Sequence, residues 1–197
     1  MTTLWLVRHA HTLAPSGLCY GATDLEADEE ATRAAARSLA RMLPQGLPVS
    51  SSPLRRCLQL ALALQELRPD LVHQPDARLT EMDFGTWEGQ RWDAIGRGAF
   101  ERWMADFAGH RCGGGDNVAD LMARVAPALR EAAEGGDRVW ITHAGVVRAA
   151  RLLARGVACP QQASDWPDEG LDFGACEQLD LRVNAVSADV APRLRCD

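Results

Sequence analysis

The sequence contains no lysine, and all 21 of its basic residues are arginine. Without a lysine amine the chain can form neither a Walker-type phosphate loop nor a Schiff base with a carbonyl substrate or pyridoxal phosphate. Arginine holds its charge at all working pH values and binds phosphate oxygens bidentately. The composition therefore excludes the lysine-dependent enzyme classes but allows phosphate chemistry.

Cysteine pairs, long apolar runs and excess positive charge are also missing. The six cysteines are scattered without a Cys-x-x-Cys spacing, which predicts free thiols in a reducing compartment. No stretch approaches the roughly 20 apolar residues of a membrane span, and no basic leader precedes the first apolar run. The formal net charge of −6 disfavours nucleic acid and membrane surfaces as partners. We expect a cytoplasmic protein.

The 197 residues, 47% of them hydrophobic and 24% charged, fit a single domain spanning 1–197. Short apolar runs alternate with longer segments of helical pattern, which favours an α/β fold. We expect a three-layer α/β/α sandwich with a mainly parallel central sheet. The expected strands cover 4–7, 47–50, 138–142 and 177–183, and the expected helices cover 28–44, 51–64, 118–134 and 146–154.

The segment 84–107 interrupts this alternation and holds six of the eleven aromatic residues. Two interpretations stay open: the aromatics anchor short helices by packing, or the wider subregion 84–116 forms a lid over the site. In the second case, rings such as Trp87, Trp92 and Trp103 could stack on a nucleotide-like base.

Polar side chains follow two of the expected strands. Arg8 and His9 come directly after the first strand, and His143 follows the strand 138–142. Parallel strands end at the same edge of a sheet, where open α/β folds bind ligands. Arg56 lies near the start of a helix, which is a favourable place for an anion. These four residues together predict an anion site.

Four motifs in this order resemble the histidine phosphatase superfamily, the group that contains the cofactor-dependent phosphoglycerate mutases. They span nearly the whole chain and cover 6–12, 51–57, 79–89 and 142–148. The resemblance implies a phosphoglycerate mutase-like fold and a small-molecule phosphate ester as substrate. It implies no metal and no cofactor.

The resemblance also assigns roles. His9 attacks phosphorus and becomes a phosphohistidine, Glu81 is the general acid, and His143 completes the catalytic set. Arg8 and Arg56 bind the phosphoryl oxygens. Thr12 either adds a hydroxyl to the phosphate site or caps the following loop. The nearby acids Asp83 and Glu88 are expected to be structural.

Within the superfamily, the stretches 19–24 and 87–93 look most like the α-ribazole phosphatase branch, which acts late in cobalamin assembly. The chain has little room for the insertions and tail that shield the phosphoenzyme of the mutases from water, so hydrolysis is favoured. We consider a homodimer as the oligomeric state of the chain.

Two residues of the catalytic motifs differ from the family pattern, and three alternative functions stay open. Ala10 and Ala144 stand where the family has glycine, which would strain the backbone if a positive φ were required there. A catalytically silent phospholigand-binding module is one rival that these alanines motivate. The others are a phosphoglycerate mutase-type phosphotransferase and a metallohydrolase built on His9, His11 and His143.

Overall fold

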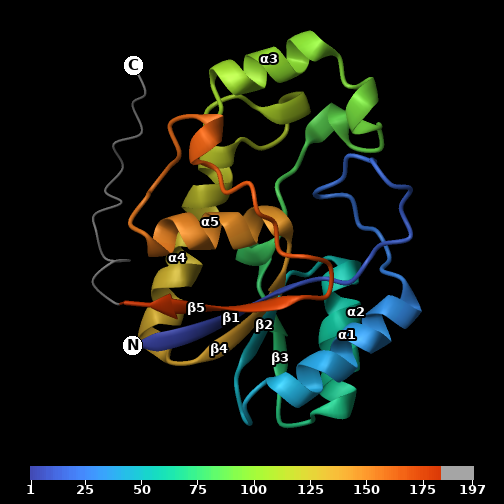
Figure 1. The fold of residues 1–197 in the computed structure, drawn as a ribbon, viewed down its shortest axis with the longest axis vertical. Helices are drawn as coiled ribbons and strands as arrows, with labels where there is room; N and C mark the ends of the chain where they lie inside the picture. The colour runs from blue at the N-terminus through green and yellow to red at the C-terminus, as the bar shows by residue number, and fades with distance from the viewer. Residues whose placement is uncertain (183–197) are drawn as a thin grey trace.

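The central sheet has five strands in the order β3-β2-β4-β1-β5, seen edge-on in the lower half of Figure 1. The structure is a computed structural model that describes residues 1–182. The strands are β1 (Thr2–Arg8), β2 (Val49–Ser51), β3 (His73–Pro75), β4 (Arg138–Thr142) and β5 (Cys176–Leu181).

The strands that carry the site are parallel. β1 pairs with β4 from Leu4 opposite Arg138 to Arg8 opposite Thr142, so the two strands end side by side. β2 is parallel to β4 and β3, whereas β5 runs antiparallel to β1. The prediction of a mainly parallel α/β sheet is confirmed.

Within residues 1–182, five α-helices connect these strands: α1 (Glu29–Met42), α2 (Arg55–Leu67), α3 (Arg97–Ala105), α4 (Val118–Gly135) and α5 (Ala144–Ala154). α1 begins as predicted, because the Asp28 side chain accepts a hydrogen bond from the Ala31 N–H at 2.8 Å. α2 begins later than predicted, since Ser51 still pairs in β2. α5 begins at Ala144, directly after His143.

The helices form layers on the two faces of the sheet. α1 and α2 pack on one face over Trp5, Val7 and Ile141, whereas α4 and α5 pack on the other face over Leu4, Leu6 and Trp140 (Figure 1). Alternate residues of one strand point to opposite faces, so β1 contributes to both cores. This is the predicted three-layer arrangement.

The segment 84–116 extends away from the sheet at the upper end of the molecule in Figure 1. It contains α3 and three 3₁₀ turns: Gly85–Trp87, Trp92–Ala94 and Cys112–Gly114. Its aromatic rings pack on one another, as Trp103 does on Phe107 with centroids 5.6 Å apart.

The sequence interpretation missed β3, which is three residues long, polar and ends in a proline. The last expected strand, 177–183, is observed as β5, and Val183 lies outside the described residues. In the part of the chain that the structure describes, no helix combines the length and the hydrophobicity that crossing a bilayer requires.

Candidate active site

His9 lies just beyond the end of β1, and the residue is only 2% exposed. Its backbone N–H donates to the Thr142 carbonyl at 3.0 Å, so β4 continues to hold the chain after the strand ends. The ring Nδ1 lies 2.7 Å from the Ala10 carbonyl oxygen. A carbonyl only accepts, so Nδ1 carries the proton and Nε2 keeps its lone pair.

The surroundings of His9 keep this ring neutral. Burial, followed by the positive charge of Arg56, lowers the pKa of His9 from 6.5 to about 3. The Nε2 lone pair therefore persists at neutral pH and well into the acidic range, which is what a nitrogen nucleophile requires.

His143 caps the N-terminal end of α5, with its ring centroid 5.2 Å from that of His9. Arg56 Nε donates to its Nδ1 at 3.3 Å, so the ring proton belongs on Nε2, which lies 2.8 Å from Ser52 Oγ. Burial and the charge of Arg56 lower the pKa of His143 well below 6.5. Because protein groups occupy both nitrogens, the predicted contact with a phosphoryl oxygen requires one of these hydrogen bonds to be exchanged.

Arg56 is fully buried in the first turn of α2. Besides His143, its guanidinium donates to the carbonyl oxygens of Gly21 at 2.6 Å and Thr23 at 2.8 Å. Among residues 1–182, no carboxylate forms an ion pair with it. A buried cation without a counter-ion is costly, so this place suits an anionic ligand.

Arg8 ends β1 and lies with its guanidinium carbon 3.6 Å from the centroid of the Phe173 ring. Its Nη1 donates to the Leu171 carbonyl at 2.8 Å, while its Nε is buried and has no hydrogen-bond partner in the described part of the chain. Burial lowers the pKa of Arg8. The centroid of the Phe173 ring also lies 5.4 Å from that of the His9 ring, so Phe173 packs against both Arg8 and His9.

Glu81 lies at the N-terminal end of α5, where the Gly145 N–H donates to its Oε2 at 2.9 Å. Its Oε1 accepts from the Met82 N–H at 3.1 Å. A Cβ on Gly145 would lie 2.2 Å from Oε1, so a side chain at this position would displace the Glu81 carboxylate. The helix terminus thus fixes the position of the expected general acid.

The remaining residues predicted around the site divide by their contacts. Thr12 lines the cavity, and its hydroxyl donates to Tyr20 Oη at 3.3 Å. Asp83 accepts from the Gly85 N–H, while Glu88 accepts from the N–H groups of Ala22, Thr23 and Phe84. Asp83 and Glu88 therefore have the structural contacts that the sequence predicts.

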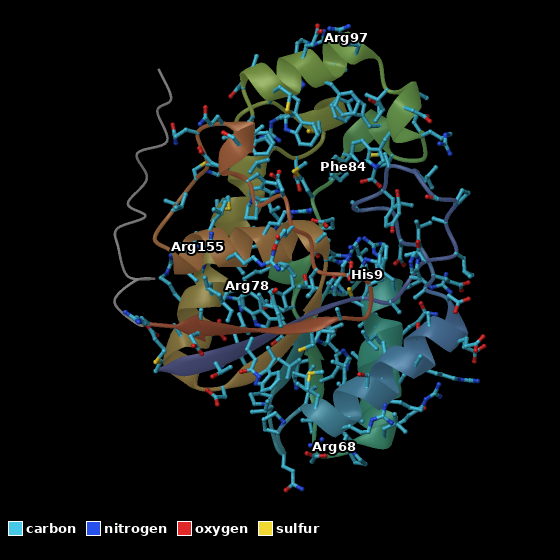
Figure 2. All side chains as sticks on the ribbon, viewed as in Figure 1. His9, Arg68, Arg78, Phe84, Arg97 and Arg155 are labelled. Atoms are coloured by element: carbon cyan, nitrogen blue, oxygen red, sulfur yellow. The ribbon has the colours of Figure 1, made fainter. Side chains whose placement is uncertain are left out.

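A cavity of about 630 Å³ joins these residues, far more than a phosphoryl group fills. His9, Arg8, Arg56, His143 and Glu81 line it beyond the carboxyl ends of β1 and β4. Figure 2 shows Phe84 above His9, on the side of the segment 84–116. That segment contributes an aromatic wall that continues with a ring from the chain after α5: Phe84, Trp92, Trp103, Phe107 and Trp166. Some aromatics of the segment therefore both pack and face the cavity.

The two alanines in place of family glycines are free of backbone strain. In the described part of the chain, no residue other than glycine has a positive φ. Ala10 is 1% exposed and Ala144 is the first residue of α5, where helical angles suit any L residue. The substitutions thus leave the site residues in place.

Residues 1–182 hold no group of three or more His, Cys, Asp or Glu side chains placed to bind a metal ion. The His11 ring instead packs on Phe173 with centroids 4.2 Å apart, rather than converging with His9 and His143. The donor set of the metallohydrolase interpretation is therefore not assembled.

Sequence reasoning missed three contributors. Ser52 was read only as part of a helix start, although it contacts His143 Nε2. Arg148 lines the cavity, and its place four residues after Ala144 on an α-helix could have indicated this. Phe173 comes from a distant loop, and no local pattern points to it.

Comparison with known proteins finds solved structures that are similar to this chain over most of its length. The mycobacterial glucosyl-3-phosphoglycerate phosphatase is 30% identical, with a TM-score of 0.75 over 91% of this chain and 90% of its own. Its complex with inorganic phosphate gives the same values. A phosphoglycerate mutase from Thermus thermophilus is 31% identical, with a TM-score of 0.71 over 90% of this chain and 92% of its own. No curated protein sequence matches the chain significantly.

The family model of the histidine phosphatase superfamily (branch 1) matches residues 4–166, most of the chain. This span contains the two strand-end histidines, Arg56 and Glu81. The chain belongs to branch 1 of the histidine phosphatase superfamily.

Proposed function

We propose that this chain is a metal-independent phosphomonoester hydrolase that works through a phosphohistidine at His9. The observation that carries the proposal is the state of the His9 ring. Its Nδ1–H donates to Ala10, its pKa is about 3, and its unprotonated Nε2 belongs to a cavity lined by Arg8 and Arg56. A fixed nucleophile beside two arginines that form no ion pair within residues 1–182 is the arrangement that phosphoryl transfer needs.

In the first step, His9 Nε2 forms a bond to phosphorus as the bond from phosphorus to the leaving oxygen breaks. Glu81 in its protonated form gives its proton to that oxygen, so the alcohol leaves neutral. Arg8 and Arg56 hold the phosphoryl oxygens and balance their charge. His143 stays neutral, positions Arg56, and offers its Nε2–H to an oxygen when Ser52 releases it.

In the second step, water attacks phosphorus and the bond to His9 Nε2 breaks. The Glu81 carboxylate takes the proton from water and is restored to its acid form, while His9 regains its lone pair. Inorganic phosphate then leaves, and the overall reaction consumes one water.

We propose two candidate substrates for this phosphomonoester hydrolase. The stretches 19–24 and 87–93 support α-ribazole 5′-phosphate, whereas the similar mycobacterial enzyme is a glucosyl-3-phosphoglycerate phosphatase. Both carry a ring on the alcohol side of the ester. A ring suits the aromatic wall, since flat or ring-shaped groups gain from contact with aromatic faces.

The test is phosphate release from these two compounds beside 4-nitrophenyl phosphate, sugar phosphates and 3-phosphoglycerate, with chelator present. We expect chelator-resistant turnover that disappears in His9→Ala, together with an acid-labile phosphoenzyme in rapid-quench samples of wild type. A matched His110→Ala variant changes a histidine that does not line the cavity and should keep the phosphoenzyme. Undiminished turnover by His9→Ala would overturn the proposal, and a requirement for a bisphosphate primer would identify a mutase instead.

A further inference from the structure

Arg148 is a third arginine in the cavity, and the mechanism above does not use it. It lies on α5, is partly buried, and lines the same cavity as Glu81. Its Nε donates to the Pro167 carbonyl at 2.8 Å and its Nη2 to the Asp168 carbonyl at 3.4 Å. Within residues 1–182, no carboxylate lies close enough to form an ion pair with it. The guanidinium is therefore oriented by backbone carbonyls of the loop and forms no ion pair with the described residues.

The neighbours of Arg148 place it on the alcohol side of the reacting bond. Arg148 follows Gly145 by three residues on α5, and the Gly145 N–H donates to the Glu81 carboxylate, so Arg148 lies one helical turn from the expected general acid. In-line attack puts the nucleophile and the leaving oxygen on opposite sides of phosphorus. The general acid must reach the leaving oxygen, so a group beside Glu81 faces the alcohol.

The proposed mechanism uses two of the three arginines that line the cavity. Arg8 and Arg56 hold the phosphoryl group, so Arg148 is the cavity arginine left to bind another anionic group of the substrate. A partly buried guanidinium in this situation favours a carboxylate, which it binds bidentately.

We propose that Arg148 binds a carboxylate on the alcohol part of the substrate, so that the preferred substrates are phosphomonoesters of ring-bearing hydroxy acids. The inference rests on the proposed hydrolase function and narrows its substrate class. The ring of the substrate lies against the aromatic wall. There the buried indole N–H of Trp103 has no acceptor among residues 1–182 and can donate to an oxygen of the alcohol part of the substrate. A neutral nucleoside phosphate would leave Arg148 unpaired.

The experiment compares 4-carboxyphenyl phosphate with 4-carbamoylphenyl phosphate, which have the same shape but differ in charge. Wild type is expected to have the higher kcat/KM on the carboxylate. Arg148→Gln is expected to lower the carboxylate-to-amide ratio about tenfold, as loss of one charged hydrogen-bonded contact predicts, and mainly through KM. Comparing one substrate pair across variants cancels the different leaving-group acidity of the two phenols.

Two matched variants distinguish carboxylate binding by Arg148 from its hydrogen bonds to the loop that contains Pro167 and Asp168. Arg151→Gln removes a neighbouring arginine that donates to the Glu169 carbonyl of the same loop and does not line the cavity, so its ratio should equal that of wild type. Arg148→Lys keeps the charge and should retain a preference for the carboxylate. An equal loss on both substrates in Arg148→Gln would overturn the carboxylate assignment. Failure of the hydrolase proposal would show separately, as turnover that survives His9→Ala.

Discussion

Two neighbouring residues, Ala144 and Gly145, tolerate a methyl group very differently. Ala144 already carries one at the first position of α5 without strain. Gly145 faces Glu81, and a Cβ there would lie 2.2 Å from Oε1. The family pattern therefore contains one glycine that can vary and one that holds the expected general acid in place.

Gly145→Ala should selectively impair general acid catalysis. The displaced carboxylate no longer protonates the leaving oxygen, so kcat/KM for an alkyl phosphate falls by about 10²-fold or more. Hydrolysis of 4-nitrophenyl phosphate falls much less, because nitrophenolate leaves without a proton. Steady-state kinetics on both esters measures the difference.

Ala144→Gly is the matched control, and its alkyl-to-aryl rate ratio should stay that of wild type. Glu81→Gln should reproduce the selective loss seen in Gly145→Ala. Equal losses on both esters in Gly145→Ala would indicate general disruption of α5 and contradict the positioning role.

The ionisation of His9 predicts how its reactivity changes with pH. Its pKa is lowered to about 3, so the nucleophilic lone pair is lost only near that pH. An unperturbed imidazole, with a pKa of about 6.5, would lose its nucleophile tenfold per pH unit below that value. Phosphoenzyme formation from 4-nitrophenyl phosphate needs no proton from Glu81, so its rate, corrected for ionisation of the substrate, should stay level from neutral pH to about pH 4.

Nitrogen NMR of the His9 ring checks the same prediction without turnover. The ring should remain neutral with its proton on Nδ1 through the acidic range. A His9 titration midpoint near its usual value, or a proton on Nε2, would contradict the assignment of a fixed, neutral nucleophile.

Among the elements, one carboxylate links two segments of the site. Glu88 accepts from Ala22 and Thr23 on one side and from Phe84 on the other. The first segment also supplies the carbonyl oxygens of Gly21 and Thr23 that Arg56 binds. Glu88 thus couples the wall that carries Phe84 to the arginine of the phosphate site.

Glu88→Gln should loosen this link, because the amide places a donor against backbone donors. We expect the free energy of unfolding to fall by about 1–3 kcal/mol. We also expect kcat/KM to fall by a similar factor for all phosphate esters, since Arg56 acts on the phosphoryl group common to them. Urea denaturation measures the free energy of unfolding, and the panel of phosphate esters measures kcat/KM. Glu101→Gln breaks an exposed pair with Arg97 and should change neither.

The elements that place the catalytic residues could be predicted because their signals are local. The apolar run before Arg8 and His9 and the run before His143 each fix one strand end, and parallel pairing brings the two ends together. Phe173 and the Ser52 contact with His143 depend on packing between distant segments, which no local period encodes. β3 was missed because a strand of two polar residues and a proline has no apolar pattern and is stabilised by pairing with β2.

At the scale of the whole molecule, two nearly inaccessible histidines link stability to pH. His9 and His143 are neutral in the folded protein, with a pKa of about 3 for His9 and one well below 6.5 for His143. The unfolded chain binds protons on both near pH 6.5, so acid favours unfolding. The stability contributed by each neutral histidine is complete above that pH. It declines as the pH falls from about 6.5 toward the folded pKa.

The free energy of unfolding should therefore fall on acidification by up to about 1.4 kcal/mol per pH unit for each of these histidines. Urea denaturation near pH 7 and near pH 5 measures the loss, which should be smaller in His9→Gln than in wild type. Carboxylates paired with arginine, such as Asp70 with Arg68, lose their contribution to the free energy of unfolding in more acidic solution. Wild type and His9→Gln share these pairs. His110→Gln alters a histidine outside the cavity and should leave the loss unchanged. An equal loss in wild type and His9→Gln would mean that His9 takes up its proton without unfolding, which contradicts the buried neutral nucleophile on which the proposed mechanism depends.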